Sequence, residues 1–165
     1  MDSTLTLAGH HAWRLGQGGT PACLSGGCDS GSYAGLDLDL IQITATVFSG
    51  SSFSAVTFRQ ASWTGCTFQS CRFSACDFDK LAVANCVFTG CSFSQSSFSD
   101  SRFSGCRFWQ CSWDGLNFDA AHWRDVALLD CSCTRITGER VRGEEVEFTG
   151  SHFEQLEFNN ARINE

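Results

Sequence analysis

Phenylalanine recurs every five residues through most of this 165-residue sequence, as in the run from Phe88 to Phe108. All fifteen Phe of the chain lie on this one phase. An α-helix would spread side chains spaced five apart around its axis, and a flat strand would alternate them between its two faces. The rings can share one core only if the chain turns a corner every five residues. The pattern therefore predicts a solenoid.

A second phase supports this interpretation. Two residues before each Phe stands a small or aliphatic residue, such as Cys66, Leu81 or Cys91. Each five-residue unit is therefore expected to point one small and one large side chain inward, while the other three residues, mostly polar, face solvent.

The units Cys66-Thr-Phe68-Gln-Ser, Cys71-Arg-Phe73-Ser-Ala and Cys91-Ser-Phe93-Ser-Gln resemble the pentapeptide-repeat family. The resemblance extends over about Leu36 to Ile163. It implies an all-β fold, a right-handed quadrilateral β-helix of about six to seven coils in which residues twenty apart stack. At Gly138 and Gly143 the large inward residue is missing, and a loose coil or a bulge is expected there.

We divide the chain into an N-terminal cap or flexible arm, residues 1–34, and the β-helix, residues 35–165. Thr4 to Leu7 alternates like a short strand. Cys23 and Cys28, together with His10 and His11, allow a zinc site as an alternative to a plain cap. A cover for the first coil is expected because an open β edge invites aggregation.

The eleven Cys follow the inward phases. Eight occupy the small position, and Cys23, Cys28 and Cys133 occupy the Phe position. This predicts reduced thiols that pack as small hydrophobic groups. Disulfides or a metal along the column Cys71, Cys91, Cys111 and Cys131 are the alternative. We expect no cofactor and no metal.

The net charge of −7 argues against binding of nucleic acid or a membrane surface and favours a basic protein partner. No apolar run is long enough to span a membrane, and residues 1–15 do not resemble a secretion signal, so a cytoplasmic location is expected.

Stacking at twenty-residue intervals gathers acids on the side that carries Phe58, Phe78, Phe98 and Phe118. The outward acids predicted there are Asp37, Asp39, Asp77, Asp79, Asp100, Asp119, Glu139 and Glu157. Only Arg59, Lys80 and Arg140 oppose them. This acidic stripe is interpreted as a ladder of carboxylates for a basic groove, or simply as a solvated surface.

The opposite side offers a different candidate. Trp109 is off the Phe phase and is expected to point outward, with Leu129 beside it and Arg107 next to it. An exposed Trp of this kind is typical of an interface anchor, although it is also compatible with a solitary surface aromatic.

The four His do not form a triad with Ser and Asp, and no phosphate loop is present, so an enzyme is not expected. We predict a non-enzymatic, bacterial, protein-binding inhibitor, an immunity protein that neutralises a nuclease toxin. The family resemblance implies an alternative, since some members mimic DNA and bind DNA gyrase, a topoisomerase, conferring quinolone resistance. A structural spacer or secretion-associated adaptor is a further alternative. A monomer and a homodimer both remain open.

Overall fold

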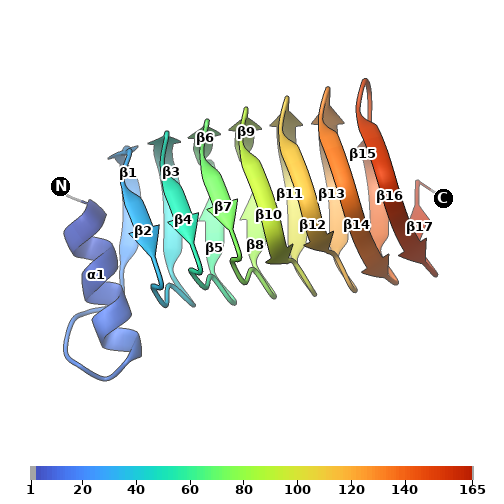
Figure 1. Ribbon diagram of the computed structural model, residues 1–165. Coiled ribbons are helices and arrows are strands. Elements are labelled where there is room, and N and C mark those ends of the chain that lie inside the picture. The colour runs from blue at the N-terminus through green and yellow to red at the C-terminus, as the bar shows by residue number, and fades with distance from the viewer. Residues whose placement is uncertain (1–2, 165) are drawn as a thin grey trace.

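A computed structural model of the chain describes residues 3–164, which form one helix followed by a rod of stacked β-coils (Figure 1). Helix α1 spans Ser3–Arg14. The strands are β1 Cys23–Asp29, β2 Ser32–Ala34, β3 Gln42–Ser49, β4 Ser52–Ser54, β5 Ser62–Thr64, β6 Thr67–Gln69, β7 Arg72–Ser74, β8 Ala82–Ala84, β9 Val87–Thr89, β10 Ser92–Ser97, β11 Arg102–Trp109, β12 Ser112–Asn117, β13 His122–Leu129, β14 Ser132–Glu139, β15 Arg142–Glu147, β16 His152–Asn159 and β17 Arg162–Ile163. The strand pairs are parallel.

The chain turns a corner after every five-residue unit. At the corners the backbone takes a positive φ, as at Ala55 (53°), Gln60 (59°) and Ser70 (53°), two positions after an inward-facing ring. Within residues 3–164 no β-branched residue occupies such a position, in keeping with the steric cost of a left-handed backbone for those side chains. The corners direct every fifth residue to the same interior, and the predicted solenoid is confirmed.

Neighbouring coils pair with an offset of twenty residues, as in Phe48 with Phe68 and Phe68 with Phe88. A ten-stranded sheet covers two adjacent sides because strands such as β11 and β13 run through a corner, and a seven-stranded sheet covers another. The remaining side, which carries Phe58 to Phe118 and which we term the turn side, is joined by isolated bridges such as Thr57 with Asp77.

Aromatic rings stack along the rod axis in the core. The centroids of Phe48 and Phe68 are 4.8 Å apart, those of Phe68 and Phe88 are 4.7 Å apart, and those of Phe88 and Phe108 are 4.5 Å apart. The paired rings are parallel to within 5°. Such aromatic pairs contribute about 0.5–1.5 kcal/mol each beyond the burial of their area, so the stacks stabilise the register of the coils.

The expected loose coil at Gly138 and Gly143 is absent, and that prediction was wrong. Both residues are buried within β14 and β15 and keep the regular register with the next coil. A Cβ at Gly138 would lie 2.6 Å from Val141 Cγ2 and 3.1 Å from the Phe158 ring. The neighbouring side chains therefore fill the space that a large residue would have taken.

The N-terminal end of the rod is covered by α1, not by a strand over Thr4 to Leu7 (Figure 1). The helix buries Leu7 and His10, three residues apart on one face, against the first coil. His10 Nε2 lies 2.7 Å from Asp39 O, and the Ala22 N–H donates to His10 Nδ1 at 2.8 Å. The strand prediction was wrong because burying Leu7 and His10 against the first coil outweighs the alternation of polar and apolar residues over residues 4–7.

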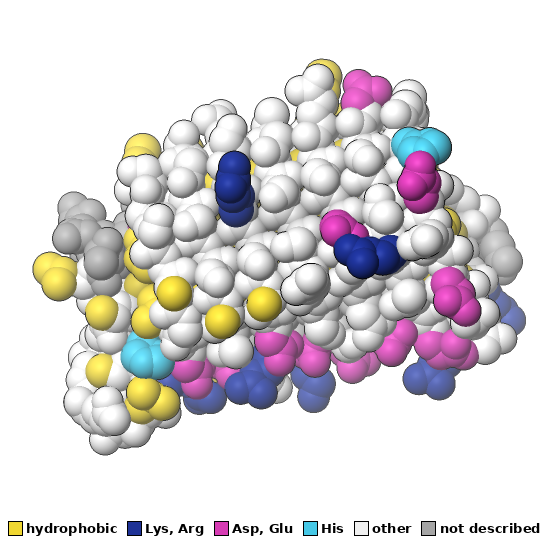
Figure 2. Space-filling view, in the orientation of Figure 1, with side chains coloured by type: hydrophobic (Ala, Val, Ile, Leu, Met, Phe, Trp, Pro, Cys, Tyr) yellow, Lys and Arg dark blue, Asp and Glu magenta, His cyan; other side chains and the backbone are white. Residues whose placement is uncertain are grey.

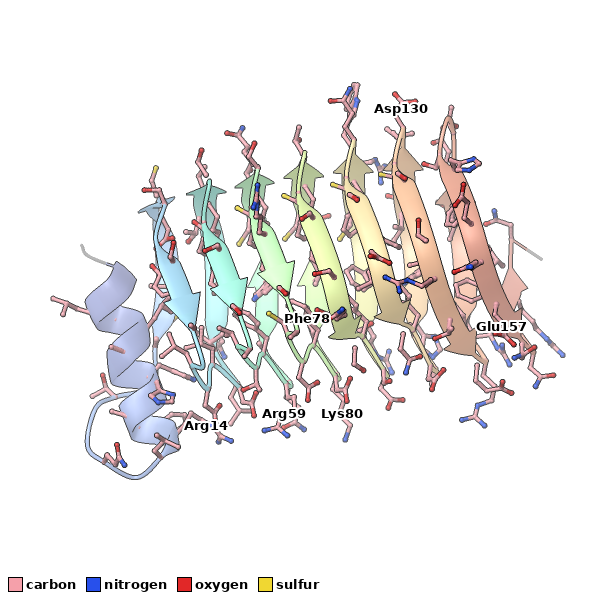
Figure 3. All side chains as sticks on the ribbon, viewed as in Figure 1. Arg14, Arg59, Phe78, Lys80, Asp130 and Glu157 are labelled. Atoms are coloured by element: carbon pink, nitrogen blue, oxygen red, sulfur yellow. The ribbon has the colours of Figure 1, made fainter. Side chains whose placement is uncertain are left out.

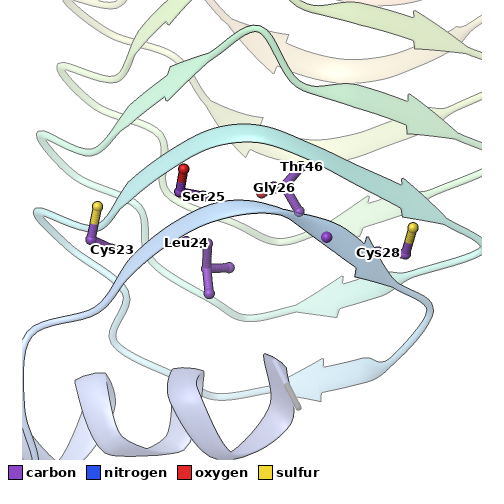
Figure 4. A pocket seen from close by; sticks show the side chains of 7 residues that line it. Cys23, Leu24, Ser25, Gly26, Cys28 and Thr46 are labelled. Atoms are coloured by element: carbon purple, nitrogen blue, oxygen red, sulfur yellow. The ribbon is translucent and has the colours of Figure 1, made fainter. Parts of the chain in front are cut away.

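The first coil is one residue short. Strand β1 pairs with β3 at an offset of nineteen, so Leu24 lies opposite Ile43 and Asp29 opposite Phe48. Leu24 and Asp29 are buried, whereas Cys23 and Cys28, expected on the inward phase, are exposed near the two ends of β1 (Figure 4).

Candidate protein-binding surfaces

The acidic residues of the turn side line the lower edge of the rod, where they alternate with basic side chains (Figure 2). Arg14, Arg59 and Lys80 extend from this edge, and Glu157 lies near its C-terminal end (Figure 3). The edge therefore carries both acidic and basic side chains at its N-terminal end. The net charge that a partner would meet there depends on how accessible each carboxylate is.

Asp39 does not face solvent as predicted. Its residue is 4% exposed, and its carboxylate accepts hydrogen bonds from the Arg59 N–H at 2.7 Å and from Arg59 Nε at 2.9 Å. Arg14 Nη2 lies 3.6 Å from the same carboxylate, and Arg14 Nε lies 3.2 Å from Asp37 Oδ1. The helix and the second coil thus neutralise the first two acids of the stripe.

Carboxylates and an amide on the turn side also bind backbone N–H groups that no strand ladder satisfies. Asp37, Asp77 and Asn117 each accept from the N–H two residues later at 3.0 Å. Asp39, Asp79 and Asp119 accept from the N–H twenty residues later, at 2.7, 3.1 and 2.8 Å. Sequence reasoning missed this role. Its signal is the forty-residue recurrence of Asp-x-Asp, ending in Asn117-x-Asp119.

Burial raises the pKa of Asp77 above its ordinary value, and the charge of Asp79 acts in the same direction. Arg59 opposes this shift only from 3.9 Å. The Asp77 carboxylate is therefore a costly charge for the fold, and its hydrogen bond to the Asp79 N–H at 3.0 Å holds it in place.

The acids whose carboxylates can still contact a partner lie farther along the rod. Asp100 and Glu157 are exposed, and Asp79, Asp119 and Glu139 are partly exposed. They extend from the third coil to the last, with the bases Lys80 and Arg140 exposed among them. This set, which we term the acidic face, is narrower than the predicted stripe.

Trp109 lies two corners away, on the side opposite the acidic face. Its side chain is half exposed, at 50%, and Leu129 lies directly beside it in β13. Arg107 is fixed by its Nη2, 3.0 Å from Asp125 Oδ1, and by hydrogen bonds to two carbonyls. Val87, opposite Arg107 in β9, is 40% exposed. An apolar patch with a fixed guanidinium is thus formed by β9, β11 and β13.

The cysteines of the rod are free, and nine are buried. The thiols of the column donate to backbone carbonyls, as Cys71 Sγ does to Phe48 O at 3.3 Å. Burial raises the pKa of Cys76 to about 11 and that of Cys133 to about 12. The thiols of Cys76 and Cys133 are therefore protonated packing groups at neutral pH.

The zinc alternative is not supported by the residues that suggested it. Both ring nitrogens of His10 are engaged within the cap, and His11 Nδ1 accepts the Asp37 N–H at 2.8 Å. Among residues 3–164, no group of three or more His, Cys, Asp or Glu side chains is placed to hold a metal ion. The other two histidines are exposed on different sides, and His152 lies 3.1 Å from Glu154.

A family profile described as a pentapeptide repeat region matches residues 61–137 and 82–165, which together cover more than half of the chain. The chain belongs to the pentapeptide-repeat family. Proteins of this fold typically act as structural or binding proteins rather than as enzymes.

Two solved pentapeptide-repeat structures are similar to this chain. Trypsin-treated QnrB1, a plasmid-mediated fluoroquinolone resistance protein, is 12% identical, with a TM-score of 0.50 over 87% of this chain and 90% of that chain. Rfr23 from the cyanobacterium Cyanothece 51142 is 11% identical, with a TM-score of 0.48 over 98% and 99% of the two chains. A comparison with curated protein sequences finds no match. Within residues 3–164, no helix has the length and apolar character needed to cross a membrane.

Proposed function

We propose that this pentapeptide-repeat protein is a non-enzymatic inhibitor that docks its acidic face into the basic groove of a DNA-acting enzyme. The observation that carries the proposal is the run of available carboxylates, from Asp79 through Asp119 to Glu157, on one side of a rigid rod. Unlike Asp39, these groups lack an ion pair with Arg or Lys in the described part of the chain. Complementary charge of this kind accelerates encounter and fixes orientation.

A nuclease toxin is the partner class that we favour, which makes the protein an immunity protein of the bacterial cytoplasm. The acidic face occupies one side of the rod, while the adjacent side mixes acids with the bases Arg102, Arg124 and Arg142. A general mimic of the DNA duplex would present negative charge more evenly. An acidic surface on one side suits the groove of a single dedicated partner. Either a monomer or a homodimer could present this surface to the partner. Direct binding of nucleic acid or membrane is not part of the proposal.

The test uses charge-neutral variants that retain hydrogen-bond acceptors. The acidic-face variant carries Asp79→Asn, Asp100→Asn, Asp119→Asn and Glu157→Gln, so that the backbone N–H groups keep an oxygen partner. A matched control removes the same number of charges elsewhere, through Asp130→Asn, Glu145→Gln, Glu147→Gln and Glu154→Gln. Both are compared with the unmodified chain in DNA cleavage by the nuclease toxins of the host and in supercoiling by its gyrase.

The expected result is protection against one nuclease, lost in the acidic-face variant and retained in the control. Inhibition of gyrase with the same dependence on the variants would identify the topoisomerase as the partner instead. Equal inhibition by both variants would remove the acidic face from the mechanism. Inhibition of neither enzyme would leave the structural spacer or adaptor as the better account of the rod.

A further inference from the structure

A column of three Arg and one His runs along the side of the rod adjacent to the acidic face. Arg102, His122, Arg142 and Arg162 stand in register on β11, β13, β15 and β17. Arg102 and His122 are exposed, Arg142 is partly exposed and Arg162 is exposed. We term these four residues the basic column. In the three preceding coils the same position holds the uncharged Gln42, Ser62 and Ala82.

Two members of the basic column, Arg102 and Arg142, lack an ion pair within residues 3–164. Arg14, Arg59, Arg107 and Arg135 each lie within 4.0 Å of a carboxylate oxygen elsewhere in the structure. In the described residues, neither Arg102 nor Arg142, nor Arg124 beside them, forms such an ion pair. An external anion would supply the partner that Arg102 and Arg142 lack.

The column also borders an open groove. Arg102, His122, Arg124 and Arg142 line a hollow of about 330 Å³ whose floor includes the buried Phe103 and Trp123. Glu144 is the single acid of the lining. Arg142 Nη1 is held by the carbonyls of Val141 and Asn160, at 3.1 and 2.7 Å. The groove thus has a fixed guanidinium at one end and an unpaired one, that of Arg102, at the other.

We propose that the basic column binds an extended acidic segment of a protein. At about 4.8 Å per coil, the four side chains span about 14 Å, which four to five residues of extended peptide cover at about 3.3 Å each. Guanidinium groups bind carboxylates through paired N–H donors, with direction as well as charge. The segment is clamped by Arg102 and Arg142, and His122 lies between them.

Nucleic acid fits the same surface less well. Bases of a single strand need exposed aromatic platforms, but Phe103 and Trp123 are buried beneath the column at 4% and 3% exposure. A longer polyanion would also meet Asp100 and the acidic face around the next corner. The column involves a different side from the acidic face, so its test is independent of the proposed inhibitory function.

The test measures the fluorescence anisotropy of a labelled peptide of about ten residues with alternating Asp and Ser, long enough to span the column. A peptide with Asn in place of Asp and a DNA oligonucleotide of equal charge are the comparison ligands. The column variant is Arg102→Gln with Arg142→Gln. The control variant, Arg72→Gln with Arg135→Gln, removes the same charge from another side. Circular dichroism establishes that each variant is folded.

We expect saturable binding of the Asp peptide that weakens about tenfold or more in the column variant, equivalent to about 1.4 kcal/mol, and that is unchanged in the control. Arg102→Lys with Arg142→Lys should lose part of the affinity, because Lys retains charge without the paired donors. Absence of saturable binding at low salt, or equal binding by the column and control variants, would overturn the proposal. Tighter binding of the oligonucleotide would overturn the choice of an acidic protein segment.

Discussion

Arg59 donates through its backbone N–H and its Nε to the carboxylate of Asp39, twenty residues earlier, at 2.7 and 2.9 Å. Arg14 from α1 approaches the same carboxylate, so Asp39 joins the helical cap to the first two coils. An acid that the sequence assigned to the surface is therefore part of the structure of the rod.

This relationship predicts that Asp39→Ala destabilises the protein by about 1–3 kcal/mol, because it leaves a backbone N–H without its acceptor and two guanidinium groups without their buried partner. Glu157→Ala, at an exposed acid of the same side, should change stability by less than about 0.5 kcal/mol. Urea unfolding followed by circular dichroism measures both. Equal midpoints for the two variants would contradict the structural role of Asp39.

The accessibility of the thiols gives a second prediction. Cys23 and Cys28 are exposed, and the other nine thiols are buried. Ellman's reagent at neutral pH should therefore titrate two thiols rapidly in the folded protein and the other nine only after unfolding, because the protein shields buried thiols from the reagent. Rapid reaction of more than two thiols in the native state would show that the core opens. Cys23→Ser with Cys28→Ser should abolish the rapid phase.

Two adjacent aromatic residues of β11 have different environments: Phe108 lies in the core and Trp109 lies on the surface. Phe108 is buried and stacks on Phe88 with centroids 4.5 Å apart, whereas Trp109 is half exposed. Phe108→Ala should cost about 3–5 kcal/mol, while Trp109→Ala should leave stability within about 0.5 kcal/mol. Thermal unfolding tests both. If Trp109 also anchors a partner beside Leu129, its substitution weakens binding without changing the melting temperature. Comparable destabilisation by the two substitutions would place Trp109 in the core.

The fold was predictable because one spacing admits few solutions. A ring at every fifth residue requires a corner in every unit, and the structure supplies it as a positive φ at Ala55, Gln60 and the equivalent positions. The identity of the corner residues carries little of this information, since Gly, Ala, Ser, Gln and charged residues all occur there. The periodic core, rather than turn propensity, specified the architecture.

The ends of the rod and the fine structure of the turn side were not predictable in the same way. Residues 4–7 alternate like a strand, yet the open end of the first coil selects a helix that buries Leu7 and His10. Asp29 enters the core because Tyr33 and Ser51 donate to its carboxylate, a match that hydrophobic patterning cannot reveal. Likewise, the identity of an Asp does not indicate whether its oxygens meet solvent or a backbone N–H.

Asp77 supplies the last prediction, because the chain contains its own precedent for replacing it. At the equivalent position two coils later, Asn117 Oδ1 accepts the Asp119 N–H at 3.0 Å, as Asp77 does for Asp79. Asp77→Asn should therefore retain the hydrogen bond and remove a carboxylate whose pKa burial raises. A raised folded pKa means that the folded state binds the proton more tightly, so ionised Asp77 costs stability at neutral pH.

We expect Asp77→Asn to stabilise the protein at pH 7 by no more than about 1 kcal/mol, since the partly exposed carboxylate is screened by solvent. The gain should shrink as the pH falls through the raised pKa of the folded state and Asp77 takes up its proton. It should be smallest below the ordinary Asp pKa of about 3.9. Urea unfolding of the two proteins across this range measures the difference. A variant that is less stable than the parent at pH 7, or a difference that grows on acidification, would show that Arg59 rather than burial governs this carboxylate.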